Sequence, residues 1–168
     1  RKAVELIPDG ASIIFDNSTT ALECARFINP EGKYIFYTTN LETAKILTSY
    51  TKSILYCSGG YYFPDSRGFV GSQAEAFMAS VKADVCFIGA SGITTDGITT
   101  PYPMHTPLQK AIIPSAKTKI LVCDHSKFGK RAMEKICDIT DIDTIVTDGG
   151  IADDIYDEYS KYVKIIKA

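Results

Sequence analysis

The sequence has few of the side chains that bind metal ions and none of several common catalytic motifs. It contains only two histidines, and no two of its five cysteines are spaced as C-x-x-C, so we expect no zinc site. It also has no G-x-S-x-G elbow, no Walker A motif and no H-E-x-x-H motif. We therefore expect neither a metal ion nor a cofactor.

Long apolar runs and an excess of positive charge are also missing. No apolar run reaches the length of a membrane-spanning helix, and residues 1–8 show no signal-peptide pattern. The net charge is −2, and the small basic cluster of Lys127, Lys130 and Arg131 is followed by acidic residues. These features argue against a membrane partner and against a nucleic-acid-binding surface in this stretch. The odd number of cysteines, scattered through apolar segments, favours a reducing cytoplasm.

The sequence does contain a regular alternation of apolar strands and helices. Its 168 residues suit one domain with an ordinary core. Strands are predicted at 11–15, 34–37, 53–57, 84–88, 119–123, 144–147 and 163–166. Helices are predicted at 20–28, 41–50, 72–81, 107–112, 129–137 and from 153 onward. Predicted N-caps are Ser72, Asp153 and Thr106, the last in a capping box with Gln109. Residues 61–71 are expected to form a loop or surface excursion, and 93–104 a turn-rich segment.

The strands are near-continuous apolar runs, which indicates a sheet that is covered on both faces. The predicted fold class is therefore α/β, with a mostly parallel sheet and helices on both faces. In such folds, ligands bind beyond the carboxyl ends of the strands. Six polar or glycine-rich turns should gather along that edge, at 16–20, 38–40, 58–60, 89–92, 124–127 and 148–150.

The first of these turns is the strongest candidate for an anion site. Residues 16–20 read Asp-Asn-Ser-Thr-Thr and lie between a buried strand and a helix start. Short hydroxyl side chains and free N–H groups at a helix start can hold a phosphate or a carboxylate. An ordinary capped helix would use the same residues, and the turn alone does not separate the two interpretations.

Several motifs along the chain resemble one family of bacterial regulators. They are Asp-Asn-Ser-Thr-Thr at 16–20, Thr39-Asn40, Gly59-Gly60 with Gly71, Gly92-Ile93 with Gly-Ile-Thr-Thr-Pro at 97–101, Asp-His-Ser-Lys-Phe-Gly at 124–129, and Asp-Ile-Asp at 141–143 with Asp148. The pattern is similar to the effector-sensing C-terminal domain of DeoR-family transcriptional regulators, and the Ser-Lys-Phe-Gly block is its most specific part.

The resemblance implies a regulator, most often a repressor, of sugar metabolism that responds to a phosphorylated sugar or polyol. Residues 1–168 would form one sensing domain, with 61–71 as a possible small lobe and a fold like ribose-5-phosphate isomerase and CoA transferase. An N-terminal winged helix-turn-helix would read DNA. That domain is missing here, and the start at Arg1 resembles a helix entered midway. Symmetric operators imply a homodimer or homotetramer.

The same resemblance implies which residues bind the effector. In isomerase-like proteins the Ser-Thr turn and the Asp-x-Ser-Lys turn both lie at the phosphate, where Lys127 would supply a positive charge. A surface lysine paired with Asp124 is the simpler alternative. The implied ligand-binding residues are Asp16, Asn17, Ser18, Thr19, Thr20, Thr39, Asn40, Gly59, Gly60, Arg67, Gly92, Asp124, Ser126 and Lys127.

The chain departs from the family where an isomerase would need acidic groups. Residues 89–92 contain no carboxylate, and Met104 and His105 replace the acidic residues usual before the following helix. Proton transfer requires a placed base, so we expect binding without catalysis, with Tyr102 and His105 as candidates for setting specificity. The alternatives are a sugar-phosphate isomerase or deaminase that uses Asp96 or Asp148 as its base, and a pure oligomerisation module. His125 could orient a ligand or be an exposed turn residue.

Overall fold

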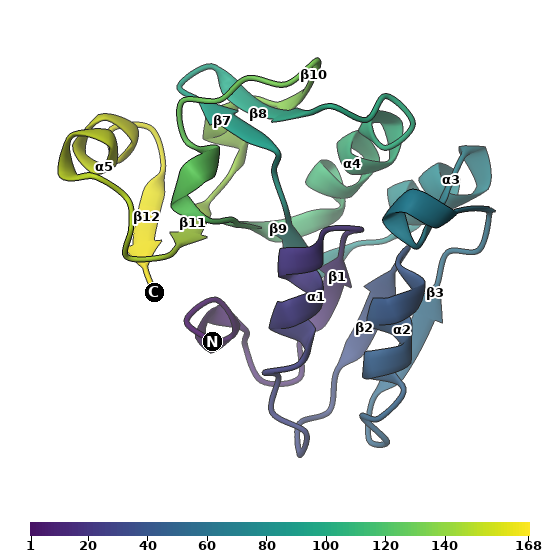
Figure 1. Ribbon diagram of the computed structural model, residues 1–168. Coiled ribbons are helices and arrows are strands. Elements are labelled where there is room, and N and C mark those ends of the chain that lie inside the picture. Colours follow the sequence, from purple (N-terminus) through teal and green to yellow (C-terminus); the bar gives the residue numbers. More distant parts are fainter.

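A seven-stranded parallel sheet runs through the molecule, which the computed structural model describes over residues 1–168 (Figure 1). In spatial order its strands are β12 (Lys164–Lys167), β11 (Thr144–Thr147), β9 (Ala116–Val122), β6 (Ala83–Ile88), β1 (Ser12–Phe15), β2 (Ile35–Thr38) and β3 (Ile54–Cys57). Every neighbouring pair is parallel. All seven carboxyl ends therefore lie at one edge of the sheet, as the alternation predicted.

Both faces of the central strands of this sheet are buried, which confirms the α/β prediction. Along β1, Ile13 and Phe15 pack into one apolar cluster, whereas Ile14 packs into the other, and none of the three side chains is exposed. In β6, the side chains of Val85 and Phe87 likewise pack into the first cluster, and those of Cys86 and Ile88 into the second. A strand whose alternate side chains enter two cores must be apolar throughout, which explains the continuous runs.

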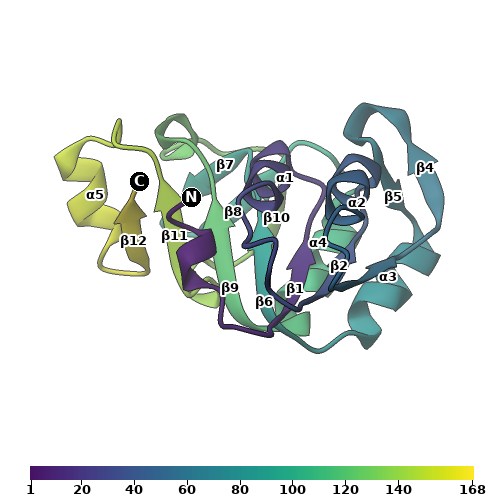
Figure 2. The same cartoon turned by 90° about the horizontal axis from the view of Figure 1, so that it is seen from below.

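Five short helices and two smaller sheets cover the faces. The helices are α1 (Thr19–Ala25), α2 (Leu41–Leu47), α3 (Ser72–Ser80), α4 (Thr106–Ile112) and α5 (Asp153–Tyr159). The smaller sheets are β10 (Glu134–Cys137), β8 (Gly97–Thr100) and β7 (Gly92–Thr94), and the hairpin of β4 (Tyr61–Phe63) and β5 (Gly68–Val70). Helices α1 and α2 contribute to one core, and α3, α4 and the three-stranded sheet to the other. Figure 2 shows α1 and α2 side by side, and the two termini near each other.

Single-turn 3₁₀ helices complete the chain. They are η1 (Val4–Leu6), η2 (Pro64–Ser66), η3 (Ile113–Ser115), η4 (His125–Lys127) and η5 (Ile139–Asp141). No helix in the structure combines the length and the apolar character that crossing a membrane requires.

The predicted helix at 129–137 is wrong. Glu134–Cys137 forms β10, which pairs antiparallel with β8 and buries Ile136 and Cys137 in the larger core. A segment this short gains little from local helix propensity. Pairing with the free edge of β8 satisfies its backbone hydrogen bonds instead, and it therefore forms a strand. Residues 93–104, predicted as turn-rich, contain β7 and β8, joined at the predicted turn of Asp96 and Gly97.

Three predicted N-caps are also wrong by one residue. The caps of α3, α4 and α5 are Gly71, His105 and Ala152, and none of them makes a side-chain capping hydrogen bond. The predicted capping box of Thr106 and Gln109 is absent because the Gln109 side chain donates to Asp16 Oδ2 at 3.4 Å instead.

Residues 61–71, predicted as a loop or surface excursion, contain the β4–β5 hairpin, which is hydrogen-bonded to the start of α2. Leu41 N donates to Arg67 O at 2.9 Å, and Phe69 N donates to Thr39 O at 2.7 Å. These backbone hydrogen bonds fix the hairpin above the carboxyl ends of β1 and β2.

At the opposite edge of the sheet, Asp84 ties three neighbouring strands together. Its Oδ2 accepts from Ser12 N at 3.0 Å and from Ser12 Oγ at 2.7 Å, and its Oδ1 accepts from Lys117 Nζ at 2.9 Å. The hydrogen bonds from Ser12, followed by that from Lys117, hold the pKa of Asp84 well below its usual range.

We expect Asp84→Asn to lower the free energy of unfolding by about 1 kcal/mol at pH 7, because the variant loses a charge-assisted hydrogen bond at a partly exposed site. A depressed folded-state pKa stabilises the protein above the unfolded-state value of about 4, and this stabilisation is lost as pH falls below it. Urea denaturation should therefore show a smaller difference in the free energy of unfolding between wild type and Asp84→Asn at pH 3 than at pH 7. Asp157→Asn, at an exposed position with no partner, is the control. A difference that grows at pH 3 would contradict the assignment.

Candidate functional site

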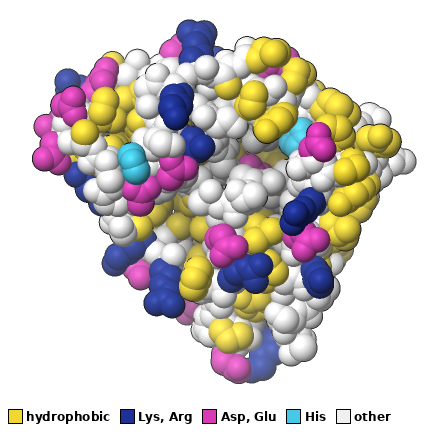
Figure 3. All heavy atoms as spheres, in the orientation of Figure 1, with side chains coloured by type: hydrophobic (Ala, Val, Ile, Leu, Met, Phe, Trp, Pro, Cys, Tyr) yellow, Lys and Arg dark blue, Asp and Glu magenta, His cyan; other side chains and the backbone are white.

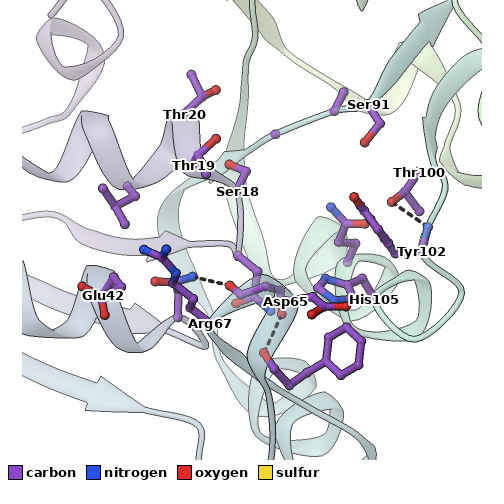
Figure 4. A pocket seen from close by; sticks show the side chains of 18 of the residues that line it. Ser18, Thr19, Thr20, Glu42, Asp65, Arg67, Ser91, Thr100, Tyr102 and His105 are labelled. Atoms are coloured by element: carbon purple, nitrogen blue, oxygen red, sulfur yellow. Dashed lines mark hydrogen bonds between the residues drawn. The ribbon is translucent and has the colours of Figure 1, made fainter.

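A cavity of about 520 Å³ opens at the carboxyl edge of the sheet. Its walls come from the starts of α1 and α2, the β4–β5 hairpin, the turn after β6, the β8–α4 connection and the turn after β9. Figure 4 shows Thr19 and Thr20 on one side, Tyr102 and His105 on another, and Arg67 below. Segments far apart in the sequence therefore share one hollow, as expected for a parallel sheet.

The α1 wall offers two free hydroxyls. Ser18 is the N-cap of α1, and its Oγ accepts from Ala21 N at 3.1 Å. The Ser18 hydroxyl is therefore already engaged by the helix. Thr19 and Thr20 are exposed and line the cavity, so their hydroxyls are available to a ligand.

Beneath this wall lies Asp16, which is 1% exposed. Its Oδ1 accepts from Ser18 N at 2.8 Å, and its Oδ2 accepts from Gly89 N at 2.9 Å and from Gln109 Nε2 at 3.4 Å. Burial raises the pKa of Asp16, and the hydrogen bonds from Ser18, Gly89 and Gln109 act in the opposite direction. The single carboxylate thus joins three walls: the α1 turn, the β6 turn and α4.

The β6 turn approaches the α1 turn as closely as backbone allows. A Cβ added at Gly89 would lie 2.2 Å from Ser18 Cβ. Any larger residue at position 89 would collide with Ser18, so this close contact between the two turns requires glycine.

The β4–β5 hairpin supplies a cation to the cavity. Asn40 caps α2 through Thr43 N at 2.9 Å and donates from Nδ2 to Ser66 O at 3.0 Å, which holds the hairpin tip in place. Arg67 at this tip has φ +52° and is the one non-glycine residue with positive φ. Its side chain lines the cavity and forms no ion pair.

A second cation comes from the turn after β9. Asp124 Oδ1 accepts from Ser126 N at 3.0 Å and so caps η4. Hydrogen bonds from Ser126 lower the pKa of Asp124. Lys127 Nζ lies 3.6 Å from Asp124 Oδ2, and its side chain is 34% exposed. Lys127 thus pairs loosely with Asp124 and also lines the same cavity as Thr19.

The structure brings together eight of the fourteen residues expected to bind a ligand. Those that line the cavity are Asn17, Ser18, Thr19, Thr20, Asn40, Arg67, Asp124 and Lys127, and those that do not are Asp16, Thr39, Gly59, Gly60, Gly92 and Ser126. Asp16 and Thr39 are buried, and the Thr39 hydroxyl donates to Asn17 Oδ1. The turns at 58–60 and 148–150 contribute no lining residue. A binding role for all fourteen residues stays a prediction.

Several lining residues were not expected from the sequence. Phe63, Asp65 and Ser66 come from the hairpin, whose fold no local pattern indicated. Gln109 was interpreted as part of a capping box, and its long-range hydrogen bond to Asp16 has no sequence signal. His105, a candidate for specificity, is 7% exposed, and burial lowers its pKa.

The two carboxylates considered as catalytic bases lie elsewhere. Asp96 lies 3.1 Å from Lys135 Nζ and 3.7 Å from Arg131 Nη2. Asp148 accepts from His125 N at 2.9 Å and pairs with His125 Nδ1 at 2.7 Å. His125 itself is an exposed residue of the turn after β9. None of the three lines the cavity. No group of three or more His, Cys, Asp or Glu side chains is arranged to hold a metal ion.

The surface around the cavity carries both signs of charge. Figure 3 shows Lys and Arg mixed with Asp and Glu over this face, without an extended basic patch. The cavity lining is mixed in the same way, with Arg67 and Lys127 beside the carboxylates of Glu42, Asp65 and Asp124.

The sheet, with its cavity beyond the strand ends, defines an α/β protein with the ribose-5-phosphate isomerase fold. Ribose 5-phosphate isomerase A from Methanocaldococcus jannaschii matches 76% of this chain and 50% of its own, with a TM-score of 0.53 and 18% identity, which supports the fold alone. The chain belongs to the DeoR family: the family described as "DeoR C terminal sensor domain" matches residues 1–149.

Proteins with similar sequences are named as transcriptional regulators. An uncharacterised HTH-type transcriptional regulator from Haemophilus influenzae is 34% identical over 90% of this chain and 59% of its own length. The glycerol-3-phosphate regulon repressor of Escherichia coli K12 is 30% identical over 88% of this chain and 59% of its own length. The chain thus spans about three-fifths of each of these relatives.

We expect Gly89→Ala to destabilise the protein by about 1–3 kcal/mol, the usual cost of overpacking, because the new methyl group would collide with Ser18. Gly149→Ala is the matched control, since nothing lies within 4 Å of an added Cβ there. Thermal and urea denaturation of both variants would measure the effect. Equal stability of the two variants would show that the two turns are not in close contact.

Proposed function

We propose that this domain senses a phosphorylated sugar or polyol for a DeoR-type transcriptional repressor, and that it binds the effector without converting it. The observation that carries the proposal is the meeting of Thr19 and Lys127, from turns more than a hundred residues apart, in one cavity. Sugar metabolism is supported by the relative that is named as a glycerol-3-phosphate regulon repressor.

The phosphate is held by hydroxyls and two cations. Thr19 and Thr20 have free hydroxyls, and Arg67 has no carboxylate partner. Lys127 is 3.6 Å from Asp124, a contact loose enough for a phosphate dianion to replace. Charge-assisted hydrogen bonds of this kind are roughly twice as strong as neutral ones, and the arginine adds fork-like geometry.

Binding without conversion is supported by what the cavity offers. Carbon-to-carbon proton transfer requires a base over the sugar. Asp96 and Asp148, the bases considered for an isomerase or deaminase, are paired with Lys135 and His125 outside the lining. Three carboxylates line the cavity, those of Glu42, Asp65 and Asp124, and that of Asp124 is engaged by Ser126 and Lys127.

In the full protein, a DNA-binding part would precede Arg1, and the sensor would associate as a homodimer or homotetramer. An effector changes DNA affinity only if it binds one arrangement of the protein better than another. The β4–β5 hairpin is the candidate for the moving element, because it carries Arg67 to the cavity and is held mainly by hydrogen bonds at α2.

We expect Lys127→Ala and Thr19→Ala each to abolish the rise in melting temperature that a bound phosphosugar causes, while the domain stays folded. Ligand at a hundred times its Kd stabilises by about 2.7 kcal/mol. The measurement is thermal unfolding with glycerol 3-phosphate, ribose 5-phosphate, fructose 6-phosphate and inorganic phosphate. Lys130→Ala, an exposed lysine beside the same turn that does not line the cavity, should respond like the wild type.

Two results would count against this proposal. If no phosphate compound raises the melting temperature, an oligomerisation module becomes the better description. If NMR of the incubated sugars shows conversion between aldose and ketose or loss of an amine, the domain is an enzyme.

A further inference from the structure

One face of the sheet carries exposed apolar side chains at its β3 edge. Ile35 and Tyr37 of β2 pair in register with Ile54 and Tyr56 of β3, so all four side chains belong to the face on which α3 lies. The residues between them pack into the other core, beneath α1 and α2. Ile35, Ile54 and Tyr56 are 37%, 56% and 46% exposed. Large apolar side chains that are exposed side by side usually mark an interaction site.

Helix α3 extends this apolar surface. The rings of Tyr37 and Tyr56 are stacked with centroids 5.3 Å apart, and the Phe77 ring lies 6.3 Å from that of Tyr37. Gln73 and Ser80 share the Phe77 side of the helix, at spacings of four and three residues, and both are exposed and uncharged. The β3 face is defined here as the surface formed by Ile35, Tyr37, Ile54, Tyr56 and Phe77.

The two edges of the sheet differ in how they are protected from other chains. Figure 1 shows β3 at one edge and β12 at the other. Strand β12 has exposed Lys164 and Lys167 at its two ends, and charged edge residues discourage pairing with another protein. Strand β3 reads Ile-Leu-Tyr-Cys, has no charge and no proline, and pairs with β2 alone. The β3 edge therefore lacks the protection that the β12 edge has.

The N-terminal residues lie on the opposite face of the sheet. Ala3 is buried in the core beneath α1 and α2, and Val4, Leu6 and Ile7 pack against the same core. Residues before Arg1 would therefore start on that face, away from the β3 face. A strongly charged partner would find no opposite charge on the β3 face. An uncharged apolar surface is instead complementary to itself, because no like charges meet across a two-fold axis.

We infer that a second copy of this chain docks on the β3 face, with Ile54, Tyr56 and Phe77 of the two copies packed together about a two-fold axis. Aromatic residues and a lack of charge are typical of the buried centre of an interface. The inference rests on the association that forms part of the proposed function and assigns a surface to it. None of the residues of the β3 face lines the cavity, so binding in the cavity and docking can be tested separately.

Sedimentation equilibrium of residues 1–168 tests the β3 face with a matched pair of variants. Tyr56 is 46% exposed, and Tyr162, close to the lysine-bearing β12, is 48% exposed. The wild type should sediment with about twice the 18.4 kDa mass of one chain. Tyr56→Lys should raise the dimer dissociation constant about a hundredfold, because a charge without a partner enters the interface twice. Tyr162→Lys should behave like the wild type.

Hydroxyl-radical labelling of the wild type gives a second readout that needs no variant. In a single chain Tyr56 and Tyr162 are almost equally exposed. Docking on the β3 face covers only Tyr56, so Tyr56 should be oxidised several times more slowly than Tyr162. If Tyr56→Lys does not fold, as circular dichroism would show, the labelling decides alone.

Three results would overturn the inference. They are a wild type that is monomeric at every concentration, an oligomer that Tyr56→Lys leaves intact, and equal oxidation of the two tyrosines. The proposed function is judged by the thermal shift with phosphosugars. A protein that docks through the β3 face and responds to no phosphosugar would refute the sensor and keep the interface, and a monomer that responds would do the reverse.

Discussion

The buried carboxylate of Asp16 is the constraint on which the rest of the site depends. It lies at the end of the central strand β1 and accepts hydrogen bonds from the turn of its own helix, from the turn of the neighbouring strand β6, and from Gln109 of α4. A buried charge is costly unless it is hydrogen-bonded, so each donor is also held in place by Asp16. The relative positions of the cavity walls follow from this network and from the close approach that Gly89 permits.

The cavity itself is a product of insertions into a plain α/β plan. A parallel sheet brings the carboxyl ends of its strands to one edge, which supplies the Thr19 and Lys127 walls. The remaining walls come from the β4–β5 hairpin and from the connection between β8 and α4. These additions contribute Arg67 and His105 to the lining, whereas the sheet plan itself supplies Thr19 and Lys127.

The same fold serves isomerases and regulators, and fold alone does not decide between them. In this chain the difference lies in the side chains at the strand ends. Neither Asp96 nor Asp148 lines the cavity: Asp96 pairs with Arg131 and Lys135, and Asp148 pairs with His125. The carboxylates that do line the cavity are those of Glu42, Asp65 and Asp124.

The sequence by itself determined the sheet, the polar turns and the family. Strand β1 and the Asn-Ser-Thr-Thr turn could be predicted from the sequence, because a continuous apolar run and a helix-capping residue are local patterns. Other features depended on tertiary contacts. Glu134–Cys137 became a strand because β8 offered an edge, Gln109 left its expected cap because Asp16 required a donor, and Gly59 and Gly60 stayed outside the cavity. Each of these outcomes depends on a partner distant along the chain, and local periodicity contains no information about such partners.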